Sequence, residues 1–172
     1  MRYAEVVIVK MFPKVYFYSI KYEGQYKSEA EKFFERFEHD ESRKNQITAF
    51  QKTLVRVGNV GALDFFFDRH EGFIDALPSK KGTKLDTPST DEYDFDLRLF
   101  WYKLSPTVVI LFNGGIKTSL YMQDSPDLFP SKHREAEKAA KAIYEATKKD
   151  GEFHIVGKTI ISRDDSPIEI SC

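Results

Sequence analysis

The chain has almost no cysteine and no long apolar run. Its single cysteine, Cys172, is the last of 172 residues, which excludes an internal disulfide and a cysteine-rich metal site and does not suggest a nucleophile. The apolar stretch in TVVILFNGGI is far shorter than the roughly 18 residues of a membrane-spanning helix. MRYAEVVIVK lacks the apolar length and cleavage pattern of a signal peptide. We therefore expect a soluble, cytoplasmic protein with no membrane partner.

An excess of positive charge is also lacking. The net charge is −1, which argues against a general nucleic-acid binder, because affinity for phosphates comes chiefly from Lys and Arg. The charges are unevenly distributed: residues 97–163 carry 11 Lys and Arg against seven Asp and Glu, whereas residues 1–96 carry 15 against 17. A local site for an anionic ligand in the C-terminal half is compatible with this pattern, and ordinary solvated charge on helix faces is the alternative.

The sequence lacks the common metal and nucleotide motifs. It has no H-E-x-x-H, no Cys/His ligand spacing, no P-loop and no G-x-S-x-G. Asn113, Gly114 and Gly115 are expected to form a turn, but no helix start follows them to bind phosphate. We therefore expect no metal and no cofactor.

Two segments near the N-terminus are rich in β-branched and aromatic residues. They are VVIVK (residues 6–10) and VYFYSIKY (residues 15–22), and the MFPK between them contains a proline that suits a turn. This pattern predicts an opening β-hairpin.

Two helices are expected next. Ser28 stands three residues before Glu31, which is the S-x-x-E capping box of a helix start. A second helix is expected from Ser42, with Gly58 placed as the glycine just beyond its end. The pair predicts a helical hairpin. Its inner faces are defined by Ala30, Phe33, Phe34, Phe37, Ile47, Phe50, Leu54 and Val57.

The middle of the chain predicts strands joined by a long loop. A short strand is expected at residues 73–77, and the prolines, glycine and polar residues of 78–91 predict a mobile loop. Apolar residues alternate with others from Tyr93 to Tyr102, as in a strand with one face on the core, so Arg98 is expected to face away from the core. Residues 107–112 are typical of a strand covered on both faces.

The C-terminal part predicts a helix and short strands. The helix is expected at residues 131–149 with an alanine-rich inner side, and FHIV and TII follow it as β-rich pieces. The order of elements predicts a single α+β domain. Its antiparallel sheet, made of the N-terminal hairpin and the central strands, packs against the helical hairpin, with a C-terminal helix and a short β tail in addition.

Four segments, taken in order, carry a resemblance to a known family. They are YSIKYEGQYKSEAEKFFERF, LRLFWY, VVILFNGGIKT and PSKHREAEKAAKAIY. Together they resemble the RelE/HigB superfamily of bacterial toxins from toxin–antitoxin pairs, which has the RelE/ParE fold. The matching family patterns are the opening strand and helix, the arginine strand Y-R-[IV]-[FL]-Y, the ending LLHGFxKK, and the helix P-x-x-E-[IL]-x-x-A. The resemblance implies a core at about residues 15–145 and a C-terminal extension at 146–172.

The chain departs from the family's pattern at several positions. Where the family has an arginine after a short strand, in L-[YW]-E-L-R, the segment FIDALP has Pro78. The family's Lys-Lys is Lys117-Thr118 here, and the His and Phe of LLHGF are Asn113 and Gly115. One cation that the resemblance implies is therefore absent from its matching position.

Arg98, Lys117 and Tyr102 are the candidate catalytic residues. The resemblance implies metal-independent RNA cleavage by a 2′-hydroxyl, which needs proton-transfer groups and cations that stabilise the phosphorane. Arg98 can bind phosphate oxygens in a bidentate manner, and Lys117 can add a point charge or, if desolvated, transfer a proton. The alternatives are an ion pair with Asp96 or a helix carboxylate for Arg98, and plain solvation for Lys117.

Other side chains are candidates for substrate contact. Tyr102 shares a strand face with Arg98 and can stack on a base or donate a proton, with cross-strand packing as the alternative. Lys103 and Tyr121 are further substrate-binding candidates, and ordinary strand-end charge is the alternative for Lys103. Lone histidines are more often surface or satisfied core residues. Three that can still approach the site are His70, His133 and His154.

The favoured functional prediction is the toxin of a type II toxin–antitoxin pair. It would be an mRNA interferase, a ribosome-associated endoribonuclease whose partners are an antitoxin protein and RNA or the ribosome. The alternative is a non-enzymatic protein on the same scaffold that binds a protein partner or blocks gyrase, because one fold serves different targets.

Overall fold

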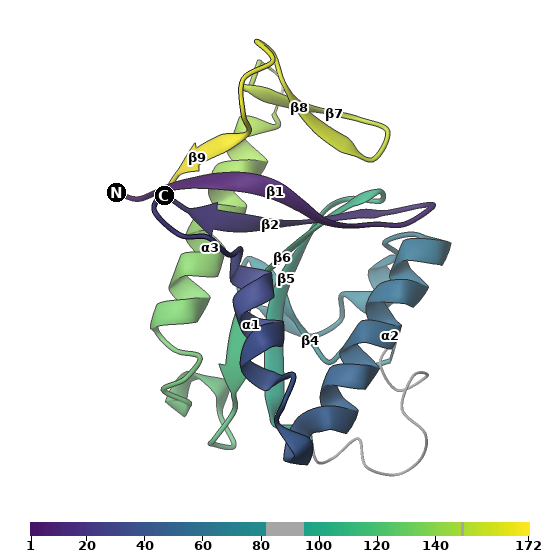
Figure 1. The fold of residues 1–172 in the computed structure, drawn as a ribbon, viewed down its shortest axis with the longest axis vertical. Helices are drawn as coiled ribbons and strands as arrows, with labels where there is room; N and C mark the ends of the chain where they lie inside the picture. Colours follow the sequence, from purple (N-terminus) through teal and green to yellow (C-terminus); the bar gives the residue numbers. More distant parts are fainter. Residues whose placement is uncertain (82–94, 149) are drawn as a thin grey trace.

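The computed structural model describes residues 1–81, 95–148 and 150–172, and these residues form an α+β fold (Figure 1). Most of the loop expected at residues 78–91 lies outside the described residues. None of the described helices is long and apolar enough to cross a membrane. The helices are α1 (Glu29–Phe37), α2 (Lys44–Val60) and α3 (Ser131–Ala146). The strands are β1 (Tyr3–Met11), β2 (Tyr16–Tyr22), β3 (His70–Glu71), β4 (Ile74–Leu77), β5 (Leu97–Ser105), β6 (Val108–Ile116), β7 (Phe153–Val156), β8 (Thr159–Ser162) and β9 (Glu169–Ser171).

Within the described residues, seven strands form one mostly antiparallel sheet in the order β3-β4-β5-β6-β2-β1-β9. The opening hairpin is confirmed, since β1 pairs with β2 in antiparallel register. β2 then lies parallel to β6, with Tyr18 opposite Ile110. A parallel pair needs a crossover connection, and α1, α2 and the strands β3 to β5 provide it. The predicted fold class is confirmed.

The first helix begins where its capping box predicts. The backbone N–H of Glu31 donates to Oγ of Ser28 over 3.2 Å, and the Ser28 hydroxyl donates to the Glu31 carboxylate over 3.2 Å. α2 begins at Lys44, after a single 3-10 turn at Glu41–Arg43. Both helices pack on the same face of the sheet, as the helical-hairpin prediction requires.

Gly58 lies inside α2, so the expectation that it ends the helix is wrong. α2 continues to Val60, and Gly61 follows it with φ at +110°, a backbone conformation that favours glycine. Gly58 is instead required by packing, because a Cβ atom there would lie 2.2 Å from Cγ of Phe12. Its carbonyl also accepts a hydrogen bond from the N–H of Lys14 over 2.9 Å. The β1–β2 turn therefore packs directly on the backbone of α2.

Each face of the sheet has its own apolar core. The core on the α1–α2 side contains Phe17, Phe33, Phe50, Leu97 and Trp101, and the core on the α3 side contains Ile20, Phe100, Phe112, Ala139 and Ile143. β5 is therefore covered on both faces, and Arg98 is only 6% exposed. The expectation that Arg98 faces away from the core is wrong, because α3 covers the face that the sequence pattern left to solvent.

The C-terminal segment extends the sheet beyond the N-terminal hairpin. β7 and β8 form a separate antiparallel hairpin at the predicted positions FHIV and TII. β9 pairs antiparallel with the outer edge of β1, with Ala4 opposite Ile170. Arg2 and Cys172 continue this ladder through two backbone hydrogen bonds of 2.8 and 2.9 Å. Figure 1 shows the two chain ends side by side at this edge.

Replacement of Gly58 by Ala is expected to lower the free energy of unfolding by about 1–3 kcal/mol, because the new methyl group overlaps Phe12. Urea denaturation measures the change. Asn59→Ala is the matched control, because Asn59 is an exposed neighbour on the same helix and its replacement should change stability by less than about 0.5 kcal/mol. Equal stability of the two variants would contradict the packing argument.

Candidate functional site

Sheet pairing brings Arg98 and Lys117 into one neighbourhood. Arg98 lies opposite Gly115 in the β5–β6 ladder. Lys117 continues that ladder, because its N–H donates to the carbonyl of Asp96 over 2.6 Å. Desolvation lowers the pKa of Lys117, and the positive charges of Arg98 and Arg69 lower it further. The two cations predicted from the sequence therefore act on each other electrostatically.

Arg98 is a buried cation with an unused donor. Its Nη1 donates to the carbonyls of Phe95 over 2.9 Å and Leu97 over 2.8 Å. Its Nε is buried and has no hydrogen-bond partner among the described residues. Burial and then repulsion by Arg69 lower the pKa of Arg98 to about 10, so the side chain stays charged at neutral pH. Because a buried donor without a partner is costly, an anion that reaches this guanidinium gains a strong contact.

Asp96 does not neutralise Arg98 by direct contact. Its carboxylate accepts hydrogen bonds from Nε and Nη2 of Arg43, over 3.1 and 2.9 Å, and from the amide of Gln46 over 2.9 Å. These bonds direct the carboxylate toward α2. The ion pair between Arg98 and Asp96, one of the alternatives drawn from the sequence, is not formed in the described part of the chain.

Arg69 adds a third cation, which the sequence did not indicate. Its Nε donates to the carbonyl of Pro78 over 2.7 Å. Burial lowers the pKa of Arg69, while the charges of Asp68 and Glu71 oppose that change. A cation is therefore present beside Pro78, the position where the family's arginine is missing.

The carboxylate of Glu71 is close enough to these cations for their charges to act on it. Burial raises its pKa, and the positive charges of Arg69, Arg98 and Lys117 oppose the rise. We name Arg69, Arg98 and Lys117, together with Glu71, the cation cluster. Asp68 is also near Arg69, but its carboxylate accepts from the hydroxyl of Ser79 and from the backbone N–H groups of residues 80 and 81. The cluster therefore holds more positive charge than Glu71 alone can neutralise.

His133 borders the cation cluster from the first turn of α3. Its Nε2 lies 2.8 Å from the backbone carbonyl of Glu71 and therefore carries the proton that this carbonyl accepts. The ring stacks on Phe129, with centroids 4.3 Å apart, and meets Phe100 at 5.5 Å. The side chains of the other two histidine candidates have a different partner or are exposed. His70 is bonded to Asp75 with its side chain 76% exposed, and His154 is exposed on β7.

Among the described residues, no hydrogen bond or ion pair joins Tyr102, Lys103 or Tyr121 to the cation cluster. Tyr102 shares the α3 face of β5 with Arg98, and it stacks on Phe73 with ring centroids 5.1 Å apart. Lys103 binds Asp64 through Nζ over 2.8 Å, and alternation along β5 directs it to the opposite face from Arg98. Tyr121 lies in the loop between β6 and α3 and is 59% exposed. The structure thus gives Tyr102 a packing contact and Lys103 an ion pair.

Asn113, Gly114 and Gly115 lie within β6, so the expectation of a turn there is wrong. A Cβ atom at Gly114 would lie 1.9 Å from the carbonyl oxygen of Arg98, and one at Gly115 would lie 2.3 Å from the carboxylate of Asp127. The two glycines therefore allow close backbone contact between β5 and β6 at the position of Arg98. Asp127 also accepts the N–H of Ile116 over 2.7 Å.

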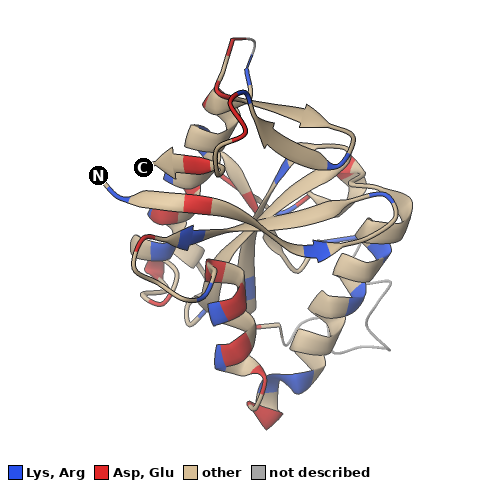
Figure 2. Ribbon diagram, turned by 45° about the horizontal axis from the view of Figure 1, so that its top comes forward, with Lys and Arg blue, Asp and Glu red and all other residues tan. Residues whose placement is uncertain are grey.

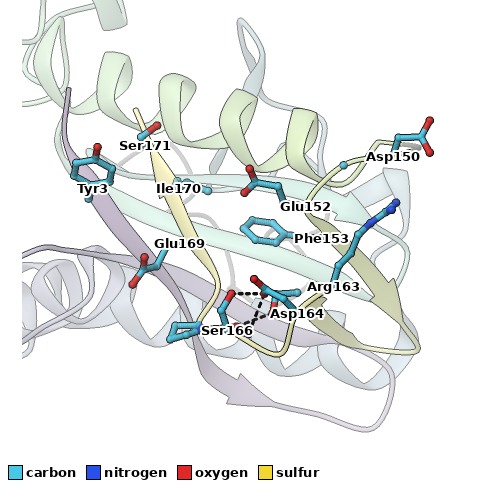
Figure 3. Close-up of a pocket in the computed structure, with 13 residues that line it drawn as sticks. Tyr3, Asp150, Glu152, Phe153, Arg163, Asp164, Ser166, Glu169, Ile170 and Ser171 are labelled. Carbon is cyan, nitrogen blue, oxygen red and sulfur yellow. Dashed lines mark hydrogen bonds between the residues drawn. The ribbon is translucent and has the colours of Figure 1, made fainter.

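A cleft at the C-terminal end of the molecule has the opposite charge. Its volume is about 490 Å³, and it lies between the β7–β8 hairpin and β9 (Figure 3). Glu152, Asp164 and Glu169 line it, with Arg163 as its basic residue. Because carboxylates repel anions, this cleft is a poor site for phosphate, and the cation cluster is the better candidate.

Comparison of the chain with protein-family models, with curated proteins and with solved structures gave no match. Within the described residues, no group of three or more His, Cys, Asp or Glu side chains could hold a metal ion.

The cation cluster can hold an oxyanion. Figure 2 shows charges of both signs on α1 and only Lys and Arg on α2. The cluster differs from such surface charge because Arg98 and Arg69 are desolvated, which strengthens their interaction with an anion. Guanidinium groups also match the geometry of phosphate oxygens. A phosphate or phosphodiester is the ligand that this arrangement fits.

Sulfate is expected to raise the midpoint of thermal unfolding by binding the folded cluster. It also stabilises proteins generally by exclusion from their surface, so the informative quantity is a difference between variants. Most of the binding-dependent increase should be lost in Lys117→Ala and retained in Lys52→Ala, whose ammonium group is exposed on α2. Thermal unfolding monitored by circular dichroism measures it, and an equal increase in all three proteins would rule out the anion site.

Proposed function

We propose that this chain is a RelE/HigB-like toxin, a ribosome-associated endoribonuclease of a type II toxin–antitoxin pair. The observation that carries the proposal is the group of three cations, Arg69, Arg98 and Lys117, around Glu71. The four segments that carry the family resemblance form β2 with α1, then β5, β6 and α3. Three of these, β5, β6 and α3, border the cluster, which supports the assignment.

The proposed reaction is cleavage of messenger RNA without a metal. The 2′-oxygen attacks the phosphorus, the bond from phosphorus to the 5′-oxygen breaks, and the leaving oxygen takes a proton from water. The products are a 2′,3′-cyclic phosphate and a 5′-hydroxyl. Arg98, Arg69 and Lys117 would stabilise the charge on the phosphorane. Glu71 is the candidate acceptor of the 2′-hydroxyl proton, because burial brings its pKa closer to neutrality. The chain as a whole is near neutral and would bind RNA weakly by itself, so the ribosome would position the messenger. The reaction would take place in the cytoplasm. The antitoxin would inhibit the toxin by covering the cation cluster.

Expression of the chain in a bacterium is expected to stop growth and to fragment messenger RNA. Lys117→Ala should lower the cleavage rate roughly 100-fold, as the loss of one group that stabilises transition-state charge does. Arg98→Met, which keeps most of the side-chain volume, should lower it at least as much. Northern blotting of an induced messenger and growth curves measure these effects.

The matched control is the double variant Lys52→Ala and Lys103→Ala. It removes two cations that lie away from the cluster, one exposed on α2 and one bonded to Asp64. This variant should remain toxic and cleave messenger RNA. Normal growth on expression of the wild-type chain, with intact messenger RNA, would end the proposal.

The second candidate is a non-enzymatic protein on the same scaffold that binds a protein partner or blocks gyrase. The observation that favours it is the bonding of Arg98, because an arginine that donates to two backbone carbonyls at 6% exposure also serves a structural role. A DNA supercoiling assay with purified gyrase separates the two. Inhibition of supercoiling without RNA cleavage selects this candidate and removes the ribonuclease.

A further inference from the structure

Three aromatic rings contact one another on the α3 side of the sheet, the side to which Arg98 also belongs. Phe73, in the turn between β3 and β4, stacks on Tyr102 of β5 with ring centroids 5.1 Å apart and an interplanar angle of 20°. Tyr144 of α3 meets the Phe73 ring edge-on at 5.9 Å and is 40% exposed. We name Phe73, Tyr102 and Tyr144 the aromatic platform. It joins three elements, two of which also border the cluster.

The platform is connected to the cluster along two elements. Phe73 lies two residues beyond Glu71. Tyr102 lies on the same face of β5 as Arg98, about 13 Å away at roughly 3.3 Å per residue. The turn is fixed to α3, because the N–H of Phe73 donates to the carboxylate of Glu137 over 2.7 Å. Gly72, with φ at +76°, allows that approach, since a Cβ atom there would lie 2.5 Å from Glu137. The platform therefore has a defined position relative to the cluster.

α3 adds exposed cations along the platform. Arg134, Lys138 and Lys141 recur at steps of four and three residues, so they share one stripe of the helix. All three are exposed, and none of them forms an ion pair in the part of the chain that the structure describes. Nζ of Lys141 lies 5.7 Å from the centre of the Phe73 ring. Positive charge is therefore available directly beside the stacking surface.

We propose that the aromatic platform and the Arg134–Lys138–Lys141 stripe bind the strand that flanks the cleavage position in single-stranded RNA. A base stacks against Phe73 and Tyr144, and the neighbouring phosphates lie along α3. Stacking rings next to unpaired cations are the common means of binding single strands, whose base faces are free. A duplex hides those faces.

This inference rests on the proposed function, which assigns the phosphate at the cation cluster as the scissile phosphate of RNA. At about 3.4 Å per stacked nucleotide, the distance of about 13 Å corresponds to roughly four nucleotides. The platform therefore contacts a base a few nucleotides from the scissile phosphate, and shorter substrates lose that contact.

Fluorescence anisotropy with a fluorescein-labelled 2′-O-methyl RNA of about eight nucleotides tests the inference. The methylated 2′-oxygen prevents cleavage, so the assay measures binding alone. Tyr144→Ala and Phe73→Leu should each weaken binding by about fivefold to hundredfold, the usual effect of losing one base-stacking ring. Tyr26→Ala, which removes a tyrosine that is 99% exposed in the β2–α1 turn, should leave binding unchanged.

The salt dependence of RNA binding tests the Arg134–Lys138–Lys141 stripe separately. Lys141→Ala should reduce the slope of log affinity against log salt concentration by about 0.7, the value expected for one phosphate contact on a single strand. Lys52→Ala, on α2, should leave the slope unchanged. Circular dichroism shows whether each variant is folded, and Tyr144→Ala tests the platform at an exposed position even if Phe73→Leu unfolds.

Four outcomes overturn the inference. They are the absence of RNA binding by the wild-type chain, equal affinity of Tyr144→Ala and Tyr26→Ala, an unchanged salt slope in Lys141→Ala, and binding of a duplex as tight as that of the single strand. Each of them counts even if the chain cleaves RNA. Platform-dependent binding by a chain that neither cleaves RNA nor arrests growth supports the binding surface and removes the proposed ribonuclease instead.

Discussion

The antiparallel contact between β5 and β6 determines where the candidate site lies. This ladder places Arg98 opposite Gly115 and continues to Lys117 through the carbonyl of Asp96. The close approach requires Gly114, because any side chain at that position would overlap the backbone of Arg98. A shift of the pairing by one residue would turn every side chain of β5 to the other face. The two cations would then be separated by the sheet.

The energetic cost of burying positive charge makes the candidate site favourable for an anion. Removing Arg98 from water is unfavourable, and the nearby charge of Arg69 increases that cost, as the lowered pKa of about 10 shows. The two carbonyls that accept from Nη1 offset only part of it. Arg98 stays charged although it is buried, so the fold bears an electrostatic cost. An anion that binds Arg98 would reduce that cost. Exposed lysines on α2 have no comparable penalty for an anion to remove.

Features that depend on residues close in sequence could be predicted. The capping box at Ser28 and Glu31, the opening hairpin and the β5–β6 hairpin all depend on neighbours within a few positions, and each is present. Two of the three errors came from contacts between distant segments. Gly58 packs on Phe12 from another element, and Arg98 is covered by a helix that begins more than 30 residues later. Local patterns contain no information about either contact.

The candidate site was only partly predictable for the same reason. Arg98 and Lys117 come from adjacent strands, so their proximity follows from a predicted hairpin. Arg69 could not be found, because a strand of two residues has no periodicity and the contact with Pro78 depends on the turn that follows it. The sequence could, however, have predicted that Lys103 and Arg98 lie on different faces of the sheet. The two residues are an odd number of positions apart on one strand, and side chains alternate between faces.

The short outer strands of the sheet affect how the molecule can associate with others. A strand at the edge of a sheet has free backbone groups that can pair with another chain. β9 covers the first part of β1, and the opposite edge of the sheet is β3, which has only two residues. Among the described residues, β3 and β9 therefore offer only short edges for intermolecular strand addition. At these two ends of the sheet, contact with another chain would depend on side chains more than on shared β-structure.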